Sequence, residues 1–336
     1  MKKTPKVIIG AGFGSSGLSA FIDFLDEIDG IYSTPQEFAM FNDPDGLISL
    51  ESALVDNWSI FQGNVAIRRF VKLANVLSKK YKSPYPNLDY SIFFGNKFKK
   101  AVNKYIENIT NLTFIGLSYG VDTLIKRQLN QRLPIFRRSR LTNDTMYLAK
   151  NLTEKDFIKH TKEFINELAD ICLTKYNKST FVFDEGFVSL SINKVLRYLP
   201  KDAKIVVVIR DPRDVYAELI ASNDAWMFQP NKIDDFIEYQ NAMFIRWEEE
   251  KKLCDPNVFL ELKFDELILN YDKSKNTILQ FLNIHPDRHA FPKKNLDPNI
   301  SKKNVGRWKK VLKDHEIQLF NERLRSVLLK NNWLKK

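Results

Sequence analysis

The stretch KVIIGAGFGSSGLSAFIDFL, residues 6–25, decides the fold. Lys6 to Ala11 form a short apolar run that is typical of a buried strand, and a glycine-rich turn follows. A helix is predicted from about Ser16 to Ile28, because apolar residues recur there at helical spacing. Residues 30–33 resemble a second strand. A strand, a helix and a strand in this order predict a parallel α/β sheet.

The second half of the chain returns to alternating strands and helices. The run Ile205–Ile209 is continuously β-branched, as expected of a strand buried on both faces. A helix should begin near Pro212, where a missing N–H does no harm. Further strands are predicted at 180–183 and 258–264, and further helices at about 192–198, 234–252, 273–282 and 315–329. These elements predict a three-layer fold, a parallel sheet flanked by helices.

The middle of the chain has a different character. Helices are predicted at about 64–82, 96–109 and 154–175, and a strand at 112–117. We interpret residues 50–175 as a helical insertion or lid that binds the acceptor. No linker rich in Pro, Gly or Ser interrupts the chain, so residues 1–336 are predicted to form a single domain.

Composition limits the class of protein. The chain has 336 residues, 44% of them hydrophobic, and a net charge of +11. The charge serves solubility or a basic cleft for an anionic ligand; nucleic acid is disfavoured because the basic residues are scattered. Cys172 and Cys254 lie far apart and fit no metal spacing, so we expect reduced thiols in the cytoplasm. No stretch is long enough to span a membrane, and the apolar run after Met1 is too short for a secretory signal.

The glycine-rich turn is the first candidate site. Backbone N–H groups in such a turn, together with the positive end of the next helix, favour a phosphate. The turn resembles a dinucleotide-binding fingerprint, but Ser33 and Thr34 occupy the place of its ribose-binding acid. It also resembles a Walker A loop in which Leu18 replaces the lysine. A purely structural tight turn is the alternative. The candidate phosphate-binding residues are Gly12, Gly14, Ser15, Ser16, Gly17, Leu18 and Ser19.

Two further candidates are rich in arginine and lysine. Arg210 follows the central predicted strand, where ligands bind in open α/β sheets, and can fork onto a phosphate. The alternative is an ion pair with Asp211 or Asp214. The basic segment 302–310 could clamp a phosphate and cover an aromatic base, or could be ordinary surface charge. Its candidate residues are Lys303, Gly306, Arg307, Trp308 and Lys309.

Together the three segments resemble the sulfotransferase family of the bacterial type, which uses 3′-phosphoadenosine 5′-phosphosulfate (PAPS). The loop looks like the family's 5′-phosphosulfate loop, and residues 209–215 are similar to its 3′-phosphate motif. Residues 259–267, with 281–284, look like its late strand and the following step. Residues 305–309 resemble its C-terminal nucleotide-covering segment. The resemblance covers both ends of the chain but not the middle, and it implies a P-loop-like fold.

The resemblance implies an enzyme that transfers a sulfuryl group from PAPS, without a metal, to a hydroxyl of a carbohydrate, glycolipid or small molecule. In such a transfer a base takes the hydroxyl proton and cations stabilise the leaving phosphate. Glu37 lies where several relatives carry a catalytic glutamate, with Asp184 and Glu185 as the next candidates. The basic stretch 126–140 favours an anionic carbohydrate or an acceptor at a membrane surface. Oligomeric state is not predicted.

Two residues depart from the family pattern. Ser15 stands where relatives carry a Lys or Arg, and Glu218 stands where they carry a serine that binds the 3′-phosphate. Either Lys309 or Arg307 compensates for Ser15, or the donor differs, or activity is lost. We expect Glu218 to pair with a cation such as Arg213 or to turn outward. The alternatives are a P-loop kinase, which the missing lysine disfavours, and a non-catalytic nucleotide-binding pseudoenzyme.

Overall fold

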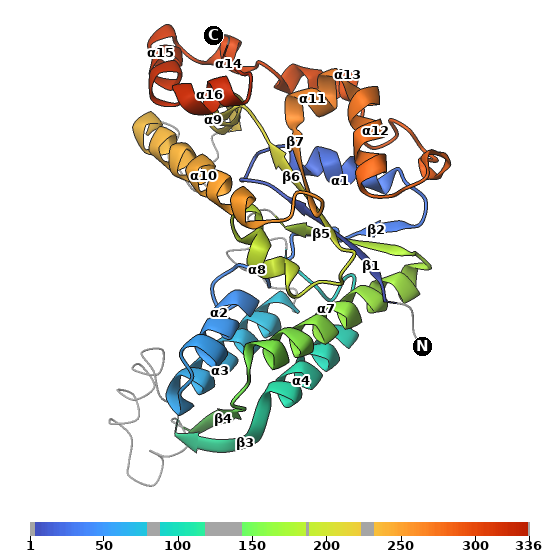
Figure 1. Ribbon diagram of the computed structural model, residues 1–336, viewed down its shortest axis with the longest axis vertical. Helices are drawn as coiled ribbons and strands as arrows, with labels where there is room; N and C mark the ends of the chain where they lie inside the picture. The colour runs from blue at the N-terminus through green and yellow to red at the C-terminus, as the bar shows by residue number, and fades with distance from the viewer. Residues whose placement is uncertain (1–3, 79–87, 118–142, 186–187, 223–231, 335–336) are drawn as a thin grey trace. The chain divides into compact units, whose positions relative to one another are not determined.

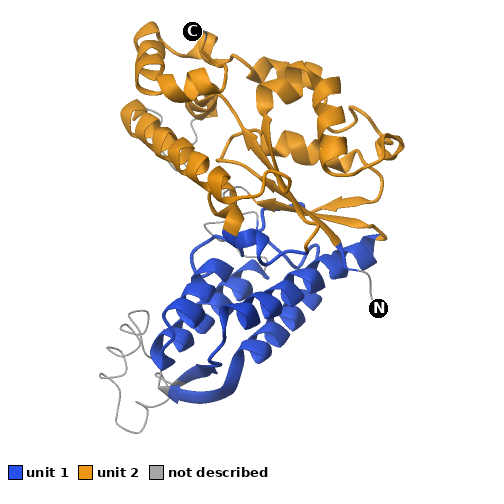
Figure 2. Cartoon of the chain, in the orientation of Figure 1, with its two compact units in different colours: residues 1–5, 35–176, 194–200 blue, residues 6–34, 177–193, 201–336 orange. Residues whose placement is uncertain are grey.

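The computed structural model describes residues 4–78, 88–117, 143–185, 188–222 and 232–334. The chain divides into two compact units (Figure 2). Unit 1 comprises residues 1–5, 35–176 and 194–200, and unit 2 comprises residues 6–34, 177–193 and 201–336. The basic stretch 126–140 lies outside the described residues. That the whole chain acts as a single domain stays a prediction.

Unit 2 contains the predicted parallel sheet (Figure 1). Five strands run in the order β2-β5-β1-β6-β7, and every neighbouring pair is parallel. The connection from β1 to β2 therefore passes over β5, so the first two strands of the chain are not neighbours. The strands are β1 (Lys6–Ala11), β2 (Ile31–Ser33), β5 (Thr180–Glu185), β6 (Lys204–Ile209) and β7 (Phe259–Lys263).

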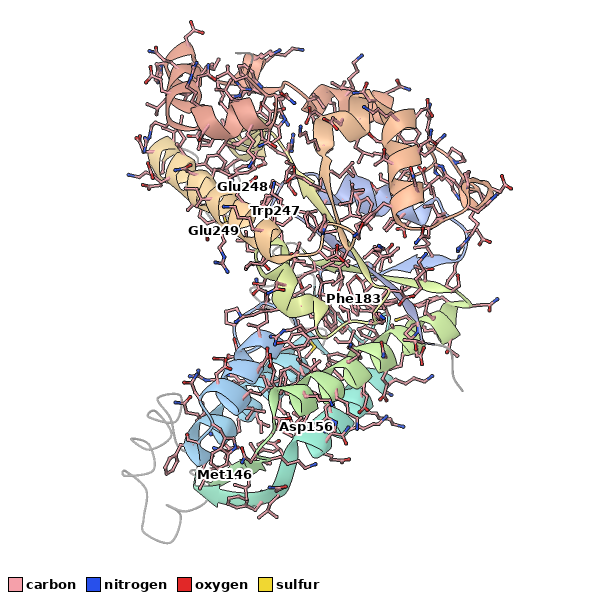
Figure 3. All side chains as sticks on the ribbon, viewed as in Figure 1. Met146, Asp156, Phe183, Trp247, Glu248 and Glu249 are labelled. Atoms are coloured by element: carbon pink, nitrogen blue, oxygen red, sulfur yellow. The ribbon has the colours of Figure 1, made fainter. Side chains whose placement is uncertain are left out.

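Helices cover both faces of this sheet. On one face, alternate residues of the central strands, such as Ile8 and Val206, pack in an apolar cluster with α1 (Leu18–Asp26), α11 (Phe264–Leu269) and α12 (Tyr271–Phe281). On the other face, Trp247 of α10 (Ile233–Leu253) packs against Phe259 of β7 and donates a 2.6 Å hydrogen bond to Glu261 (Figure 3). The predicted three-layer α/β fold is confirmed in unit 2.

A second apolar cluster of unit 2 joins α10 to α9 (Pro212–Ser222), α15 (Asp314–Arg323) and α16 (Arg325–Lys330). The sequence predicts one helix at 315–329, whereas the structure has two. They meet at Leu324, which is buried in this cluster and has a non-helical backbone. The shorter elements are 3₁₀ turns at Val188–Ser191, Pro286–Arg288 and Lys302–Asn304, and α8 (Ile192–Leu196), α13 (Pro298–Ser301) and α14 (Trp308–Val311).

Unit 1 is mainly helical, as predicted for the middle of the chain. Its helix α3 begins earlier than the periodicity suggests, because the Ser59 hydroxyl accepts the Gln62 N–H at 3.1 Å and caps it. The predicted strand at 112–117 pairs antiparallel with a second strand that the sequence did not reveal. The elements are α2 (Leu47–Glu51), a π-helix (Ser52–Asp56), α3 (Ile60–Leu77), α4 (Lys97–Ile109), β3 (Thr110–Leu117), β4 (Asn143–Ala149) and α7 (Glu154–Tyr176).

Buried aromatic rings hold the core of unit 1 together. Tyr90 stacks on Phe38 with ring centroids 5.7 Å apart. The Tyr90 hydroxyl accepts the Ala39 N–H at 2.7 Å and donates to the Glu37 carbonyl at 3.0 Å. This hydroxyl fixes the backbone that carries Glu37. Among the described helices of both units, none combines the length and apolar character needed to cross a bilayer.

Candidate nucleotide-binding site

The glycine-rich loop between β1 and α1 has an unusual backbone. Gly14, Ser15 and Gly17 all have positive φ angles, of 70°, 49° and 88°. Two hydroxyls brace the loop: Ser16 accepts the Phe13 N–H at 3.3 Å, and Ser189 donates to the Gly12 carbonyl at 2.7 Å. Within the described residues no side chain caps the first turn of α1. The Ala20 N–H donates to the Gly17 carbonyl at 3.1 Å, so the N–H groups of Leu18 and Ser19 are the ones of this turn that remain available to an anion.

Close packing explains two of the loop glycines. A Cβ on Gly12 would lie 2.3 Å from the Ser16 hydroxyl, and one on Gly17 would lie 2.3 Å from the ring of Phe264. Leu18 turns inward and packs against the apolar cluster under the sheet, while Ser15 and Ser19 are exposed. The loop is thus shaped by its neighbours as well as by its sequence.

Arg210, at the end of β6, connects three separate segments. Its guanidinium donates to the Ser15 carbonyl at 3.1 Å and to the Asn304 carbonyl at 3.0 Å. It lies 4.9 Å from the ring centre of Phe264, and its side chain is 3% exposed. Its Nε is buried without a hydrogen-bond partner among the described residues. This one side chain brings the loop and the C-terminal segment together at the carboxyl end of β6.

The third anchor of Arg210 is a carboxylate. Glu218 of α9 accepts a hydrogen bond from the same guanidinium and forms an ion pair with it. The prediction that Glu218 pairs with a cation is confirmed, although the cation is Arg210 and not Arg213. The alternative that Arg210 pairs with Asp211 or Asp214 is wrong, because its carboxylate partner is Glu218. Arg210 lies between β6 and α9, and Glu218 lies on α9, eight residues further along the chain. Glu218 therefore already binds the Arg210 guanidinium, which we expected to bind the 3′-phosphate.

Arg213 has a structural role instead. Its guanidinium donates to both oxygens of Asp211, to Asn321 and to the Trp333 carbonyl. It also stacks on the ring of Trp308, 4.1 Å from the ring centre. With 2% of its side chain exposed, Arg213 ties α9 to the C-terminal helices. The sequence predicts that the Trp308 ring covers a base. In the structure the Arg213 guanidinium already stacks on this ring.

Asp214 holds the basic C-terminal segment in place. Its two carboxylate oxygens accept the N–H of Gly306 at 2.8 Å and the N–H of Trp308 at 3.0 Å. Burial raises the pKa of this carboxyl, and the two N–H groups oppose that shift. Gly306 has a φ of 70°, which favours glycine at this turn. Asp214 thus positions Gly306 and Trp308 of the C-terminal segment, and it does not bind a ligand directly.

These groups line a small polar pocket with a volume of about 190 Å³. Pockets for drug-sized ligands have volumes of about 300–1,000 Å³, so this pocket suits one phosphate group rather than a nucleotide. Lys309 lines it, and its ammonium lies 5.5 Å from the centre of the Trp308 ring. Arg210, Arg213 and Lys309 face three carboxylates here, Asp211, Asp214 and Asp265.

The other predicted residues are placed as follows. Lys303 is exposed, Arg307 is half-buried, and neither lines the pocket. Glu37 is an exposed residue of unit 1, and the loop belongs to unit 2, so its catalytic role stays a prediction. Glu185 is buried on β5 directly beside Ala11 of β1, next to the loop, as the strand register predicts.

Three contributors were not identified from the sequence. Ser189 and the Asn304 carbonyl act through single hydrogen bonds that no local pattern signals. Phe264 packs against both Gly17 and Arg210. Its only sequence signal is its position just after a strand, where site residues gather in α/β sheets. Among the described residues no cluster of His, Cys, Asp or Glu could hold a metal ion.

Comparison with known proteins gives a family. Residues 122–288 match the model of the Sulfotransferase family, a range that includes Arg210 and Glu218 but neither the glycine-rich loop nor the segment 302–310. No curated protein sequence matches the chain.

Solved structures align along most of the chain at low identity. The sulfotransferase domain from the Synechococcus PCC 7002 olefin synthase is 13% identical, covers 94% of each chain and has a TM-score of 0.44. Mouse sulfotransferase SULT7A1 complexed with PAP is 13% identical, covers 96% of this chain and 84% of its own, and has a TM-score of 0.43. Sulfotransferase STF9 from Mycobacterium avium is 11% identical, with 98% and 76% covered and a TM-score of 0.40.

These TM-scores are low, so the fold assignment rests on the order and direction of the strands, and the family on the matched segment. The matched segment, just under half of the chain, is similar to the sulfotransferase family, and this match supports a sulfotransferase enzyme.

Proposed function

We propose that this sulfotransferase transfers the sulfuryl group of PAPS to a hydroxyl of a carbohydrate, glycolipid or small-molecule acceptor. One observation carries the proposal: Arg210 bonds to the glycine-rich loop and to the C-terminal segment at once. Three parts of the chain that each favour an anion therefore meet at the carboxyl end of the central strand. This is where open α/β sheets bind ligands.

The proposed donor divides between two anion sites of unit 2. Its 5′-phosphosulfate would lie at the first turn of α1, where uncapped N–H groups and the helix dipole favour negative charge. Its 3′-phosphate would lie in the small pocket beside Arg210. The volume of that pocket supports a single phosphate there. The ion pair with Glu218 must open, or be shared, when the phosphate binds.

The proposed chemistry is an in-line displacement at sulfur. The acceptor oxygen forms a bond to sulfur while the bond from sulfur to the 5′-phosphate oxygen breaks, and a carboxylate takes the hydroxyl proton. Preorganised N–H groups and a nearby cation stabilise the charge on the leaving phosphate. Ser15 provides no cation in the loop, so we propose Lys309 for that role. We propose that no metal takes part.

Glu37 remains the proposed base, and Glu185 is its rival. Glu37→Gln should lower turnover by about 10²-fold if it takes the proton, with donor affinity unchanged. Glu185→Gln is the parallel variant, because Glu185 lies beside the loop in the sheet register. The variant that loses turnover without losing donor affinity identifies the base. Full turnover in both variants would remove both residues from the mechanism.

A P-loop kinase is a less well supported interpretation of the same loop. Such an enzyme needs a lysine where this chain has Leu18, and the Leu18 side chain packs into the apolar cluster.

We also propose a cytoplasmic location. Both cysteines are buried free thiols, which supports a reducing compartment.

The deciding experiment compares two donors with the full-length protein. Labelled sulfate from PAPS, and separately the terminal phosphate of ATP, would be offered with a panel of alcohols and sugars. We expect transfer of sulfate only, and a loss of about 10²-fold in Lys309→Ala. Lys310→Ala is the matched control, because Lys310 is exposed and does not line the pocket. Transfer of phosphate, or nucleotide binding without any transfer, would contradict the proposal.

A further inference from the structure

One buried carboxylate fixes the backbone of a surface loop in unit 2. Glu27, the residue that ends α1, has a fully buried side chain. Its Oε1 accepts the N–H groups of Asn295 and Leu296 at 3.0 and 2.9 Å. Its backbone carbonyl accepts the Phe291 N–H at 3.2 Å. Residues 289–296 are therefore held against the end of α1, and we call them the Glu27 loop.

The Glu27 loop presents one aromatic ring and two lysines to solvent. Phe291 is 53% exposed, and the Lys294 ammonium lies 5.0 Å from the centre of its ring. Lys293 is also exposed and has a φ of 64°, a left-handed backbone that strains a residue with a Cβ. Its ammonium lies 5.4 Å from the ring centre of Tyr271, the first residue of α12. The fixed backbone thus holds both lysines beside aromatic rings at the surface.

Two further apolar side chains lie beside the Glu27 loop. Leu269 ends α11, two residues before Tyr271, and is 51% exposed. Ile300 of α13 is 63% exposed, and α13 packs against α11 (Figure 1). Large apolar side chains that gather at the surface mark an interaction site. We call this surface the basic apolar patch, and it consists of Leu269, Phe291, Lys293, Lys294 and Ile300.

The patch and the residues that follow it are positively charged. From His289 to Lys303 the chain has four lysines and one acidic residue, a net charge of +3. The acidic residue, Asp297, is half-buried and accepts the Asn299 N–H at 2.8 Å, so it caps α13. Lys302 and Lys303, directly after α13, are exposed. This stretch therefore favours an anionic partner.

The residue types of the patch favour a lipid surface as that partner. Both of its basic residues are lysines, which lack the planar fork with which arginine binds a carboxylate or phosphate of a protein or nucleic acid. A lysine stem can lie along apolar surface while its ammonium stays in water. Lys293 and Lys294 can therefore contact lipid head groups while Phe291 reaches the acyl chains. Segments that lie in the membrane interface combine Lys or Arg with Trp, Phe or Leu in this way.

We propose that the basic apolar patch binds the surface of an anionic membrane. Leu269, Phe291 and Ile300 lie at the boundary of the acyl chains, and Lys293 and Lys294 lie among the head groups. The lysines supply an electrostatic attraction that salt weakens. The apolar side chains supply burial that does not depend on charge. The proposal concerns unit 2 alone and does not depend on sulfuryl transfer.

Sedimentation of the full-length protein with vesicles tests the charged part of the patch. We expect binding to vesicles of equal parts phosphatidylserine and phosphatidylcholine, and roughly tenfold weaker binding to phosphatidylcholine alone. Lys293→Gln/Lys294→Gln should weaken binding to the mixed vesicles by roughly tenfold or more at low salt, because each lysine contributes a factor of about five. The matched control is Lys99→Gln/Lys100→Gln, which removes two adjacent exposed lysines of α4 and should weaken binding by less than about threefold.

The variant Phe291→Ala tests the apolar part. It should weaken binding to the mixed vesicles about fivefold at both low and high salt, because less apolar surface is buried in the bilayer. Ile245→Ala is the matched control, since Ile245 of α10 is also 53% exposed and lies outside the patch. Circular dichroism checks that each variant is folded.

The proposal is overturned if the wild type binds neither kind of vesicle or binds both alike, or if each patch variant loses no more affinity than its control. Polyglutamate gives a further outcome. If it binds as tightly as the mixed vesicles, with a loss in Lys293→Gln/Lys294→Gln and none in Phe291→Ala, the partner is an acidic protein and the membrane assignment is wrong. Weaker vesicle binding in both patch variants, with both controls unaffected, supports the proposal. Sulfuryl transfer is measured separately, so its failure leaves this result unchanged.

Discussion

Removal of the Glu218 carboxylate should strengthen binding of a 3′-phosphate. Glu218 and the phosphate compete for the same guanidinium, since Arg210 is 3% exposed and already bonds to Glu218 and two backbone carbonyls. A charge-assisted hydrogen bond contributes about 1.5–3 kcal/mol. Because the Glu218 side chain is 40% exposed, solvent screening reduces this to about 1–2 kcal/mol.

That energy sets the size of the effect. In the wild type the nucleotide must displace Glu218, so Glu218→Ser should raise the affinity for adenosine 3′,5′-bisphosphate by about 5–30-fold. The affinity for adenosine 5′-monophosphate should stay the same, because it lacks the competing group. Calorimetric titration of both nucleotides with both proteins measures the difference directly.

The control variant is Glu249→Ser on α10. Glu249 forms an exposed ion pair with Arg246 at 3.5 Å, so its removal changes the net charge equally without touching Arg210. The reasoning is refuted if Glu218→Ser leaves the bisphosphate affinity unchanged, or if it strengthens both nucleotides alike. The first result would mean that the phosphate does not bind at Arg210, and the second that only overall charge matters.

Three further predictions concern stability. Gly17→Ala should lower the free energy of unfolding by about 2 kcal/mol or more, since its φ is 88° and the new Cβ would lie 2.3 Å from a ring; urea denaturation checks this, and an unchanged midpoint contradicts it. Arg213→Ala should cost about 3–5 kcal/mol because Asp211 would be left buried without its partner, whereas Arg246→Ala, which removes an exposed pair, should cost less than about 1 kcal/mol. Burial and a neighbouring carboxylate raise the pKa of Asp43 from 3.8 to about 6, so the folded state holds this proton more tightly than the unfolded state. The contribution of Asp43 to stability is therefore full below about pH 4 and is lost as the pH rises through 6. Asp43→Asn should flatten this part of the stability profile, and a profile identical to that of the wild type would show that Asp43 does not titrate in this range.

Local patterns in the sequence were sufficient for most of the elements. The strand Lys6–Ala11 has the bounds that its apolar run predicts, and the continuous β-branched run of β6 is buried as expected. Where the local sequence pattern predicted the wrong element, packing against another part of the chain explains the difference. The strand β4 exists because β3 pairs with it. The predicted helix 315–329 breaks at Leu324, which packs into a core shared with α9 and α10.

The sequence by itself determined that the three anion-favouring segments exist and which residues they contain. Glycine positions, strand ends and helix starts depend on the conformational preferences of a few adjacent residues, so they can be predicted locally. Only the tertiary structure decided what Arg210 binds: its partners Ser15, Glu218 and Asn304 come from three segments of unit 2. Ion pairs and cavities depend on distances across the fold, and the chain acquires those distances only when its distant segments pack together.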